Sequence, residues 1–342
     1  MQTTTDVQKN RVHYKQIAQI SGLSVATISR IFTGRAKVAE DTKDKVVKAL
    51  AALGIDDGLF RIKENQRGGL LVFNIPSFGN PFYAKIMSGA KSAATQRGWQ
   101  LLVNEEHIND STIDNFILLL QKVRAAGLVT ANHVPPAQLQ RIAKTIPLVQ
   151  CCEFDRAFDI PYVSIDDSMA TRSAMEYLIS LGRRNIGFVN GPIRYKYARE
   201  RLQGYRESME KSGLPMDPTL VIQLPEISYN LAVSALTNIF NTGKRPDAFF
   251  CASDILAAAV IKVCARYGLK VPKDVAVIGF DNVDISFMSS PTITTISQPE
   301  FQLGFSACEL LIERVTNGEA PLHNIVLDTE LIVRESSQQF TT

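Results

Sequence analysis

The chain has 342 residues, of which 45% are hydrophobic and 21% are charged, and its net charge is +3. This length predicts two or three domains, and the composition excludes a disordered chain, which would combine low hydrophobicity with high net charge. No apolar run reaches the roughly 18 residues that a membrane span needs. The N-terminus lacks the apolar segment of a secretory signal and the five cysteines form no CxxC motif, so we expect a cytoplasmic protein.

The first 55 residues are basic, with nine Lys and Arg against four Asp and Glu, whereas the rest of the chain is close to neutral. A basic head indicates a module that binds a polyanion, although a solvated charged face has the same composition. Ile17 lies on the apolar face of a first helix, which Gly22 interrupts. Ile28 and Ile31 continue the apolar stripe in a second helix, for which Ser24 is a suitable N-cap.

A third amphipathic helix, from about residue 41 to 53, completes a helix-turn-helix layout. In that layout the second helix enters the major groove of DNA with its N-terminus first. A three-helix bundle with a charged surface would give the same pattern. The inward residues of the third helix are predicted to be Val46, Val47, Leu50 and Leu53.

The first turns of the second helix carry the residues that such a module would present to DNA. Thr27 and Ser29 are short hydroxyl donors that suit phosphate oxygens. Arg30 is long enough to contact a guanine edge through two hydrogen bonds. Val25 and Ala26 offer only apolar contacts, for example to a thymine methyl group.

The segment that starts at Ser21 reads SGLSVATISRIFTGRAKVAEDTKDKVVKALAALG and resembles the DNA-binding domain of the LacI/GalR family of bacterial transcriptional regulators. The resemblance implies that Val25, Ala26 and Arg30 read bases and that Tyr14 and Thr33 make supporting backbone contacts. The positions that match the family pattern are Ser24, Thr27, Ser29, Arg30, Val38 and Thr42.

Residues 56–68 separate the predicted DNA-binding domain, residues 1–55, from the body, residues 69–342. In the family this stretch is a hinge helix with the pattern PNxxAxxL, which drives a leucine pair into the minor groove and kinks the duplex. Counted without gaps, this sequence has Asp57 and Gly58 in place of Pro-Asn, Arg61 in place of Ala and Glu64 in place of Leu. A carboxylate repels phosphate and cannot serve as the wedge.

Two interpretations of the atypical hinge stay open. A shifted hinge would use Leu59, Phe60 or Ile62 as the wedge. A flexible linker would instead contact DNA electrostatically, through cations such as Arg61 and Lys63. A regulator with a weakened hinge would need a partner protein.

The body alternates apolar strand-like runs with amphipathic helical stretches, which predicts parallel sheets covered on both faces. This alternation is long for one doubly wound sheet, so two α/β lobes fit better, with a ligand between them beyond the carboxyl ends of the strands. Strands are predicted at residues 70–75, 100–106, 127–131, 147–153, 162–166, 185–191, 219–224, 247–253 and 275–281.

Four stretches of the body also resemble the LacI/GalR ligand domain, including NPFYAKIMSGAKSAATQRGW from Asn80 and TTISQPEFQLGFSACELLIERV from Thr294. The resemblance covers about residues 12–338 and implies a fold similar to periplasmic sugar-binding proteins. It places the first lobe at about residues 69–165 and 294–325, the second at about 166–293, and C-terminal strands at 326–342.

The same resemblance implies a set of residues that bind a small-molecule effector. Arg201 donates hydrogen bonds and Asp281 accepts them, so together they suit a pair of hydroxyl groups or a ribose. A surface salt bridge for Arg201 and a strand-end cap for Asp281 are the alternatives. The implied effector-binding residues are Phe82, Glu153, Tyr195, Tyr197, Arg201, Ser253, Asp281 and Gln298.

Other polar and reactive residues have plainer interpretations. Asp254 follows a predicted strand and reads as a helix N-cap, and Cys151 and Cys152 read as small core residues. The sequence has no GxGxxG, GxxxxGK[ST], GxSxG or HExxH motif, and its four histidines have no metal-ligand spacing with a cysteine. We therefore expect no enzyme activity, no cofactor and no metal.

The sequence thus predicts a DNA-binding transcriptional regulator, and the resemblance implies a repressor that acts as a homodimer on a pseudopalindromic operator and is controlled by an effector bound between two lobes. A sugar is the first candidate for the effector, and a nucleoside is close behind because RLQGY, GFDNVDIS and TTISQP resemble the nucleoside-responsive members of the family. A transport-type binding protein would share the body but would not carry residues 12–53.

Overall fold

The structure is a computed structural model that describes residues 14–32, 40–53, 68–318 and 323–338. The chain divides into two compact units at Gly69–Leu70, with the loop Arg97–Trp99 grouped with the first unit. Within the described ranges, no helix is both long enough and apolar enough to cross a membrane. The residues predicted for the hinge or for DNA contacts that lie outside the described ranges are Thr33, Leu59, Phe60, Arg61, Ile62 and Lys63.

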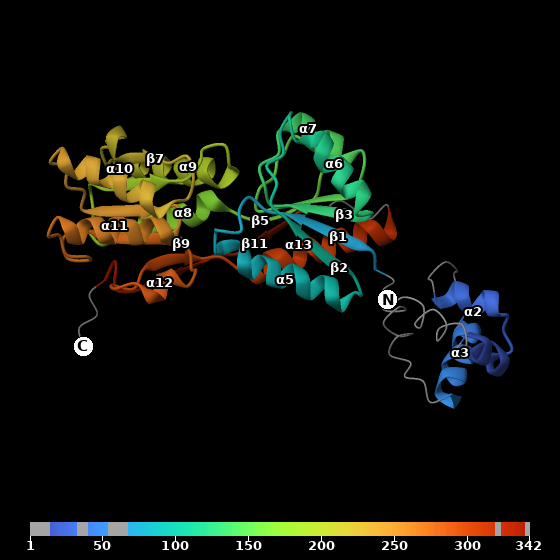
Figure 1. Cartoon of the computed structure of the whole chain (residues 1–342). Helices are drawn as coiled ribbons and strands as arrows, with labels where there is room; N and C mark the ends of the chain where they lie inside the picture. The colour runs from blue at the N-terminus through green and yellow to red at the C-terminus, as the bar shows by residue number, and fades with distance from the viewer. Residues whose placement is uncertain (1–13, 33–39, 54–67, 319–322, 339–342) are drawn as a thin grey trace, which may run out of the picture. The chain divides into compact units, whose positions relative to one another are not determined.

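The described residues of the first unit form three helices around a small apolar core, which confirms the predicted helix-turn-helix layout (Figure 1). Residues 14–21 are helical, and Gly22 turns the chain with a φ of +70°. Helix α2 (Val25–Phe32) follows, and Ser24 caps it by accepting a hydrogen bond from the Thr27 amide at 3.0 Å. Helix α3 (Glu40–Ala52) closes the core. The buried core residues are Ile17, Ala18, Ile28, Ile31, Val46, Ala49 and Leu50, with Val47 and Leu53 packed against them.

In the part of the second unit that the structure describes, the strands form two six-stranded sheets, as the two-lobe prediction requires. The first sheet has the strand order β11-β5-β4-β3-β1-β2, and each neighbouring pair is parallel. Its central strands are apolar on both faces because helices cover both. The strands are β1 (Leu70–Asn74), β2 (Gln100–Asn104), β3 (Ala125–Thr130), β4 (Leu148–Cys151), β5 (Tyr162–Ile165) and β11 (Ile325–Leu327).

The second sheet has the order β12-β10-β9-β8-β6-β7 and is parallel except for the antiparallel edge pair β10 and β12. Strands β8 and β9 are buried at every position, which agrees with the apolar sequence AFFC of β8 and the apolar run AVIGF of β9; the last residue of β9, Asp281, is buried as well. The strands are β6 (Ile186–Asn190), β7 (Val221–Gln223), β8 (Ala248–Cys251), β9 (Ala276–Asp281), β10 (Thr294–Ser297) and β12 (Glu330–Ile332).

Helices flank both sheets. Figure 1 shows α6 and α7 on one face of the first sheet and α5 and α13 on the other. In the second lobe α8 packs on α9, and α10 packs on α11. The helices are α5 (Phe82–Gln96), α6 (Ile113–Lys122), α7 (Pro136–Ala143), α8 (Asp167–Ser180), α9 (Lys196–Lys211), α10 (Tyr229–Asn241), α11 (Asp254–Arg266), α12 (Ile285–Met288) and α13 (Glu300–Asn317), with a 3-10 turn at Pro218–Leu220.

We call the first sheet with α5, α6, α7 and α13 the first lobe, and the second sheet with α8 to α12 the second lobe. The chain returns to the first lobe as predicted, because α13 packs on α5 and β11 pairs with β5. The predicted starting point at about Thr294 was wrong, since β10 pairs with β9 over Thr294–Ser297 and belongs to the second sheet. Thr295 is fully buried there and donates a hydrogen bond to Asp254. The C-terminal strands also divide, since β11 joins the first sheet and β12 the second. The chain therefore crosses between the lobes after β5, after β10 and after β11.

Helices α5 and α13 of the first lobe touch backbone to backbone. A Cβ atom added at Gly304 would lie 1.9 Å from the Ile86 carbonyl oxygen, and one at Gly89 would lie 1.9 Å from the Phe301 carbonyl oxygen. Only glycine fits at such positions, so these two residues fix how closely the helices approach.

Candidate functional site

The residues predicted to read DNA lie on the outer face of α2. Val25 is 44% exposed, and Ala26 and Arg30 are also exposed, while Ile28 between them is buried in the core. Thr27 and Ser29 are half-buried. Because the N-terminal turn is capped by Ser24 and packed through Ile28, the backbone that carries Val25 and Ala26 is held in place.

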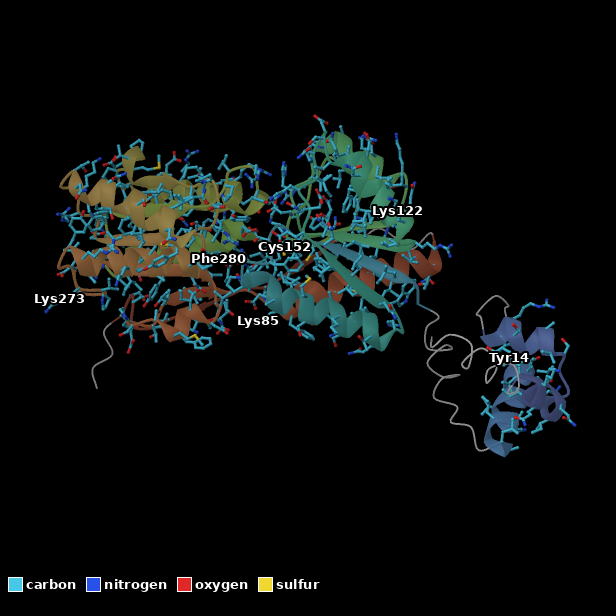
Figure 2. The ribbon with its side chains drawn as sticks, in the orientation of Figure 1. Tyr14, Lys85, Lys122, Cys152, Lys273 and Phe280 are labelled. Atoms are coloured by element: carbon cyan, nitrogen blue, oxygen red, sulfur yellow. The ribbon has the colours of Figure 1, made fainter. Side chains whose placement is uncertain are left out.

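Tyr14, which is predicted to contact the DNA backbone, also packs against the apolar core of the first unit. Figure 2 labels Tyr14 in this unit. The hydroxyl groups of Ser24 and Thr27 lie 2.8 Å apart and are exposed to solvent. This position agrees with the prediction that Thr27 contacts phosphate oxygens of DNA. The DNA contacts of these residues remain predictions.

A cavity lies between the lobes of the body, at the carboxyl ends of the strands. Its volume is about 40 Å³, enough for a few water molecules but not for a sugar ring. A second, outer cavity of about 420 Å³ adjoins it and shares Asn80, Tyr83, Tyr197 and Ile227 with it. We call these the inner and outer cavities. The inner one is lined by Phe82, Glu153, Tyr197, Arg201, Ser253, Asp281 and Gln298, among others.

Those seven residues belong to the eight that the family resemblance implied, so the fold brings them together. The eighth, Tyr195, is nearly buried and lines the outer cavity, where its ring stacks on that of Tyr197 with 5.6 Å between the centroids. Phe82 reaches the inner cavity from the first turn of α5, which Asn80 caps by accepting the Phe82 amide at 3.1 Å. Binding of an effector by these residues remains a prediction.

Arg201 is 4% exposed, which excludes the surface salt bridge that its sequence context allowed. Its Nε and Nη2 atoms each lie 2.8 Å from Asp167 Oδ1, and Nη1 donates to the Ala252 carbonyl oxygen at 2.7 Å. The Phe280 ring lies 3.4 Å from the guanidinium carbon, so the planar group is held over an aromatic face. Burial opposes the charge, but the nearby acidic groups, Asp167 foremost and then Asp281, together outweigh it and raise the pKa of Arg201.

Sequence reasoning missed Asp167 and Lys196, which complete a buried ionic network. Lys196 Nζ lies 2.8 Å from Asp167 Oδ2 and 3.0 Å from Glu200 Oε2. Burial opposes the lysine charge, but the two carboxylates outweigh it and raise the pKa of Lys196 to about 12. Burial likewise opposes the charge of Asp167, yet Lys196 and Arg201 keep its pKa below the usual value. The signal that could have identified Asp167 is its position just after the predicted strand at residues 162–166, where Asp166 and Asp167 follow one another. The polar sequence KYARER gave no sign that its lysine, Lys196, is buried.

Glu153 connects the two lobes. It follows β4 in the first lobe, and its carboxylate accepts hydrogen bonds from the first amides of α9 in the second lobe, Lys196 at 2.6 Å and Tyr197 at 3.3 Å. A carboxylate at a helix N-terminus satisfies unpaired N–H groups and faces the positive end of the helix dipole. Burial nevertheless raises the pKa of Glu153 to about 7. Tyr195 adds a second connection, donating from its hydroxyl to Asn132 Oδ1 at 3.3 Å.

Asp281 ends β9 with a φ of +102°, an uncommon value outside glycine. Gln298 donates to its Oδ1 at 2.7 Å, and Arg201 Nη1 lies 3.9 Å away. Burial raises the pKa of Asp281 well above its usual range. Backbone strain in a cavity wall agrees with a functional residue.

The interpretation of Asp254 as a helix N-cap was wrong. Ser253 caps α11 instead, accepting the Leu256 amide at 3.3 Å. Asp254 is fully buried and accepts hydrogen bonds from the Thr295 hydroxyl and the Val283 amide. It therefore ties β10 to the loop after β9, directly behind the cavity wall.

The fold and the site together define a class: a small helix-turn-helix unit joined to a two-lobed α/β body with a cavity between the lobes. Residues 14–55 match the profile of bacterial regulatory proteins of the lacI family, and residues 175–337 match that of the periplasmic binding protein-like domain. The chain belongs to the LacI family, whose members are transcriptional regulators rather than enzymes.

Relatives match over nearly the full length. The HTH-type transcriptional repressor CytR of Escherichia coli strain K12 is 29% identical over 335 residues, 97% of this chain and 98% of CytR. A solved complex of the regulator CelR with cellobiose is 28% identical, with a TM-score of 0.72 over 95% of this chain and 99% of CelR. The lac repressor dimer bound to operator shares the fold, with a TM-score of 0.77 and 22% identity over 94% of this chain and 98% of the repressor.

Proposed function

We propose that this protein is a sequence-specific transcriptional repressor whose affinity for operator DNA is controlled by a small molecule bound between its two lobes. The observation that carries the proposal is the outer face of α2, where Val25, Ala26 and Arg30 are exposed on a helix that its cap and core hold rigid. The relation to the repressor CytR and to the regulator CelR supports it. The proposal places the protein in the cytoplasm, where a bacterial operator lies.

The proposed effector is a sugar or, close behind it, a nucleoside. The inner cavity offers an acceptor pair in Asp281 and Gln298, a donor in Arg201 and aromatic faces at Phe82 and Tyr197, which is the chemistry of a hydroxylated ring. The CelR–cellobiose complex supports a sugar. The inner cavity is too small for such a ring, so the ligand must occupy the outer cavity or separate the lobes as it enters.

We further propose that two copies of the chain act together. A two-fold dimer reads a two-fold site, so the operator is expected to be a pseudopalindrome. By analogy with the family, α5 and α11 contribute to the interface. Ligand binding would then change how the two DNA-binding units are presented, because it favours one arrangement of the lobes over another.

The test is a selection from random duplex DNA with the full-length protein at physiological salt, where binding to phosphate alone is suppressed. A recovered pseudopalindrome supports the proposal, and its central base step shows whether the hinge acts as a wedge. The selected operator is then used to screen sugars and nucleosides for compounds that change its affinity. Failure to enrich any sequence, with and without these compounds, contradicts the proposal.

A further inference from the structure

Cys152 lies in the wall of the inner cavity, and Cys151 precedes it in the chain. Sequence reasoning treated both as core residues, but only Cys151 is fully buried, while Cys152 is partly exposed and lines the cavity. Their sulfur atoms are 3.7 Å apart. Figure 2 labels Cys152 where the two lobes of the body meet. The remaining cysteines, Cys251, Cys264 and Cys308, are buried.

The backbone at Cys152 has an uncommon conformation. Its φ is +65°, and the Glu153 amide donates to the Cys151 carbonyl oxygen at 2.7 Å, which closes a three-residue turn. A turn of this type with a positive φ at a residue other than glycine is rare and strained. Strain of this kind persists where the surroundings fix it, and it is often found at ligand sites.

The geometry decides which chemistry suits the pair. A disulfide would bring the sulfurs to about 2.0 Å and join residues whose Cα atoms are about 3.8 Å apart, below the usual range of about 4.4–6.8 Å for disulfides. An atom that bonds to both sulfurs would leave them non-bonded, as they are now. No group of three or more His, Cys, Asp or Glu residues within the described ranges is arranged to hold a metal ion. The pair therefore suits a trivalent atom that bonds to both sulfurs and keeps a third substituent of its own better than it suits a disulfide or a metal ion with three protein ligands.

We propose that Cys151 and Cys152 form a dithiol site for trivalent arsenic, bound as arsenous acid. Two S–H bonds and two As–O bonds break, two As–S bonds form, and two molecules of water leave, while the third hydroxyl group stays on arsenic. Nothing is oxidised or reduced, so the reaction needs no other reagent. It also starts from neutral thiols, in agreement with the Cys151 contact and burial, which raise the pKa of Cys152.

The bound arsenic would act on the connection between the lobes. Cys152 is the central residue of the turn that positions Glu153, and Glu153 caps α9 from the opposite lobe. Fixing the Cys152 side chain to that of Cys151 changes the turn and pulls the carboxylate away from the Lys196 and Tyr197 amides. An effect of arsenic on DNA binding would rest on the proposed function. The arsenic site and its effect on the cap of α9 do not depend on it.

The site is tested with arsenite and the full chain by native mass spectrometry. We expect one arsenic per wild-type chain, released by a dithiol but not by a monothiol, and none on Cys152→Ser or Cys151→Ala. Cys308→Ala, which alters a buried cysteine away from the pair, is the matched control and keeps the arsenic. Circular dichroism shows that each variant is folded, and peptide mapping of the wild type locates the bridge independently. Uptake by Cys152→Ser, or none by the wild type, overturns the site.

The effect on the lobes is tested by hydrogen exchange at single amides. With arsenite, the Lys196 and Tyr197 amides are expected to exchange about fivefold faster, the factor that matches the loss of a helix cap. The Met169 amide, which Asp166 caps at 2.8 Å in the same lobe, serves as the control and stays unchanged. Unchanged exchange at Lys196 in the arsenic-bound chain overturns the link to Glu153. Operator selection is a separate measurement, so its failure contradicts the proposed function and not the arsenic site.

Discussion

Replacing Glu153 with glutamine is expected to remove a pH dependence from the stability of the body. Glu153 is buried between the lobes, and burial raises its pKa from 4.5 to about 7. A carboxyl group whose pKa is raised in the folded state favours folding fully below pH 4.5, and this contribution is lost as the pH rises through about 7. The wild type therefore loses stability over this window, whereas glutamine has no proton to lose.

The size of the effect follows from the pKa difference. The gap between 4.5 and about 7, at about 1.4 kcal/mol per pKa unit, corresponds to about 3 kcal/mol. Glutamine keeps one acceptor oxygen for the Lys196 amide but faces the Tyr197 amide with a second donor, so we expect the variant to be less stable than the wild type at pH 5. At pH 8 this deficit is expected to shrink or reverse. The change between pH 5 and pH 8 is about 2.5 kcal/mol, most of the full difference, because the unfolded carboxyl group is already largely ionised at pH 5.

The assay is urea unfolding of both proteins at pH 5 and pH 8, followed by the circular dichroism of the body. Asp254 and Asp281 also have raised pKa values, but the wild type and Glu153→Gln both carry these residues. The difference in pH dependence of stability between the two proteins therefore isolates the contribution of Glu153. Equal pH dependence in the wild type and in Glu153→Gln would refute the reasoning, because it would mean that the carboxyl group is not buried between closed lobes in solution.

Three further outcomes are expected. Arg30→Ala should weaken binding to the selected operator by about 1–3 kcal/mol and relax the preference at one base pair, measured by titration of labelled duplex; an unchanged preference removes Arg30 as a base reader. Asp281→Ala should abolish the response to the screened effector and leave operator affinity intact; normal effector affinity in calorimetry means that the site is wrongly assigned. Gly304→Ala should destabilise the body by about 1–3 kcal/mol or more in thermal unfolding, since its Cβ meets the Ile86 carbonyl oxygen, whereas the exposed Gly79→Ala should change little.

Local pattern was enough to predict the helices described in the first unit and nine strands of the body, β1 to β9. Ser24, Gly22 and the apolar spacing of Ile28 and Ile31 all act within a few residues, so their roles can be read from the chain. The residue at which the chain returns to the first lobe could not be read in this way, because Thr294 and Thr295 of β10 are polar residues whose hydroxyl groups are satisfied by distant partners in the second lobe.

The candidate site divides in the same way. Arg201 and Asp281 were found through family resemblance, and the fold brings them to one cavity. Lys196 lies in a string that looks solvated, and its burial depends on Asp167, 29 positions earlier in the chain. The partners of Glu153 are backbone amides, which carry no signal in the residue types at all. Long-range ion pairs and backbone contacts therefore set the limit of what the sequence shows.

The charges around the inner cavity satisfy one another, and this limits what a ligand can gain there. Asp167 is shared by two cations, and Arg201 commits three of its five N–H groups to Asp167 and Ala252, so among the described contacts two remain for a ligand or for Asp281. A ligand that enters between the lobes must separate Glu153 from α9. This separation costs more free energy while the Glu153 carboxyl group is neutral, because burial of the neutral form carries a smaller desolvation penalty than burial of the charged form. Effector affinity should therefore rise as the pH increases through about 7 in the wild type and not in Glu153→Gln. Calorimetry of both proteins at pH 6 and pH 8 with the screened effector checks this, and a parallel pH profile in the two would show that Glu153 does not control entry.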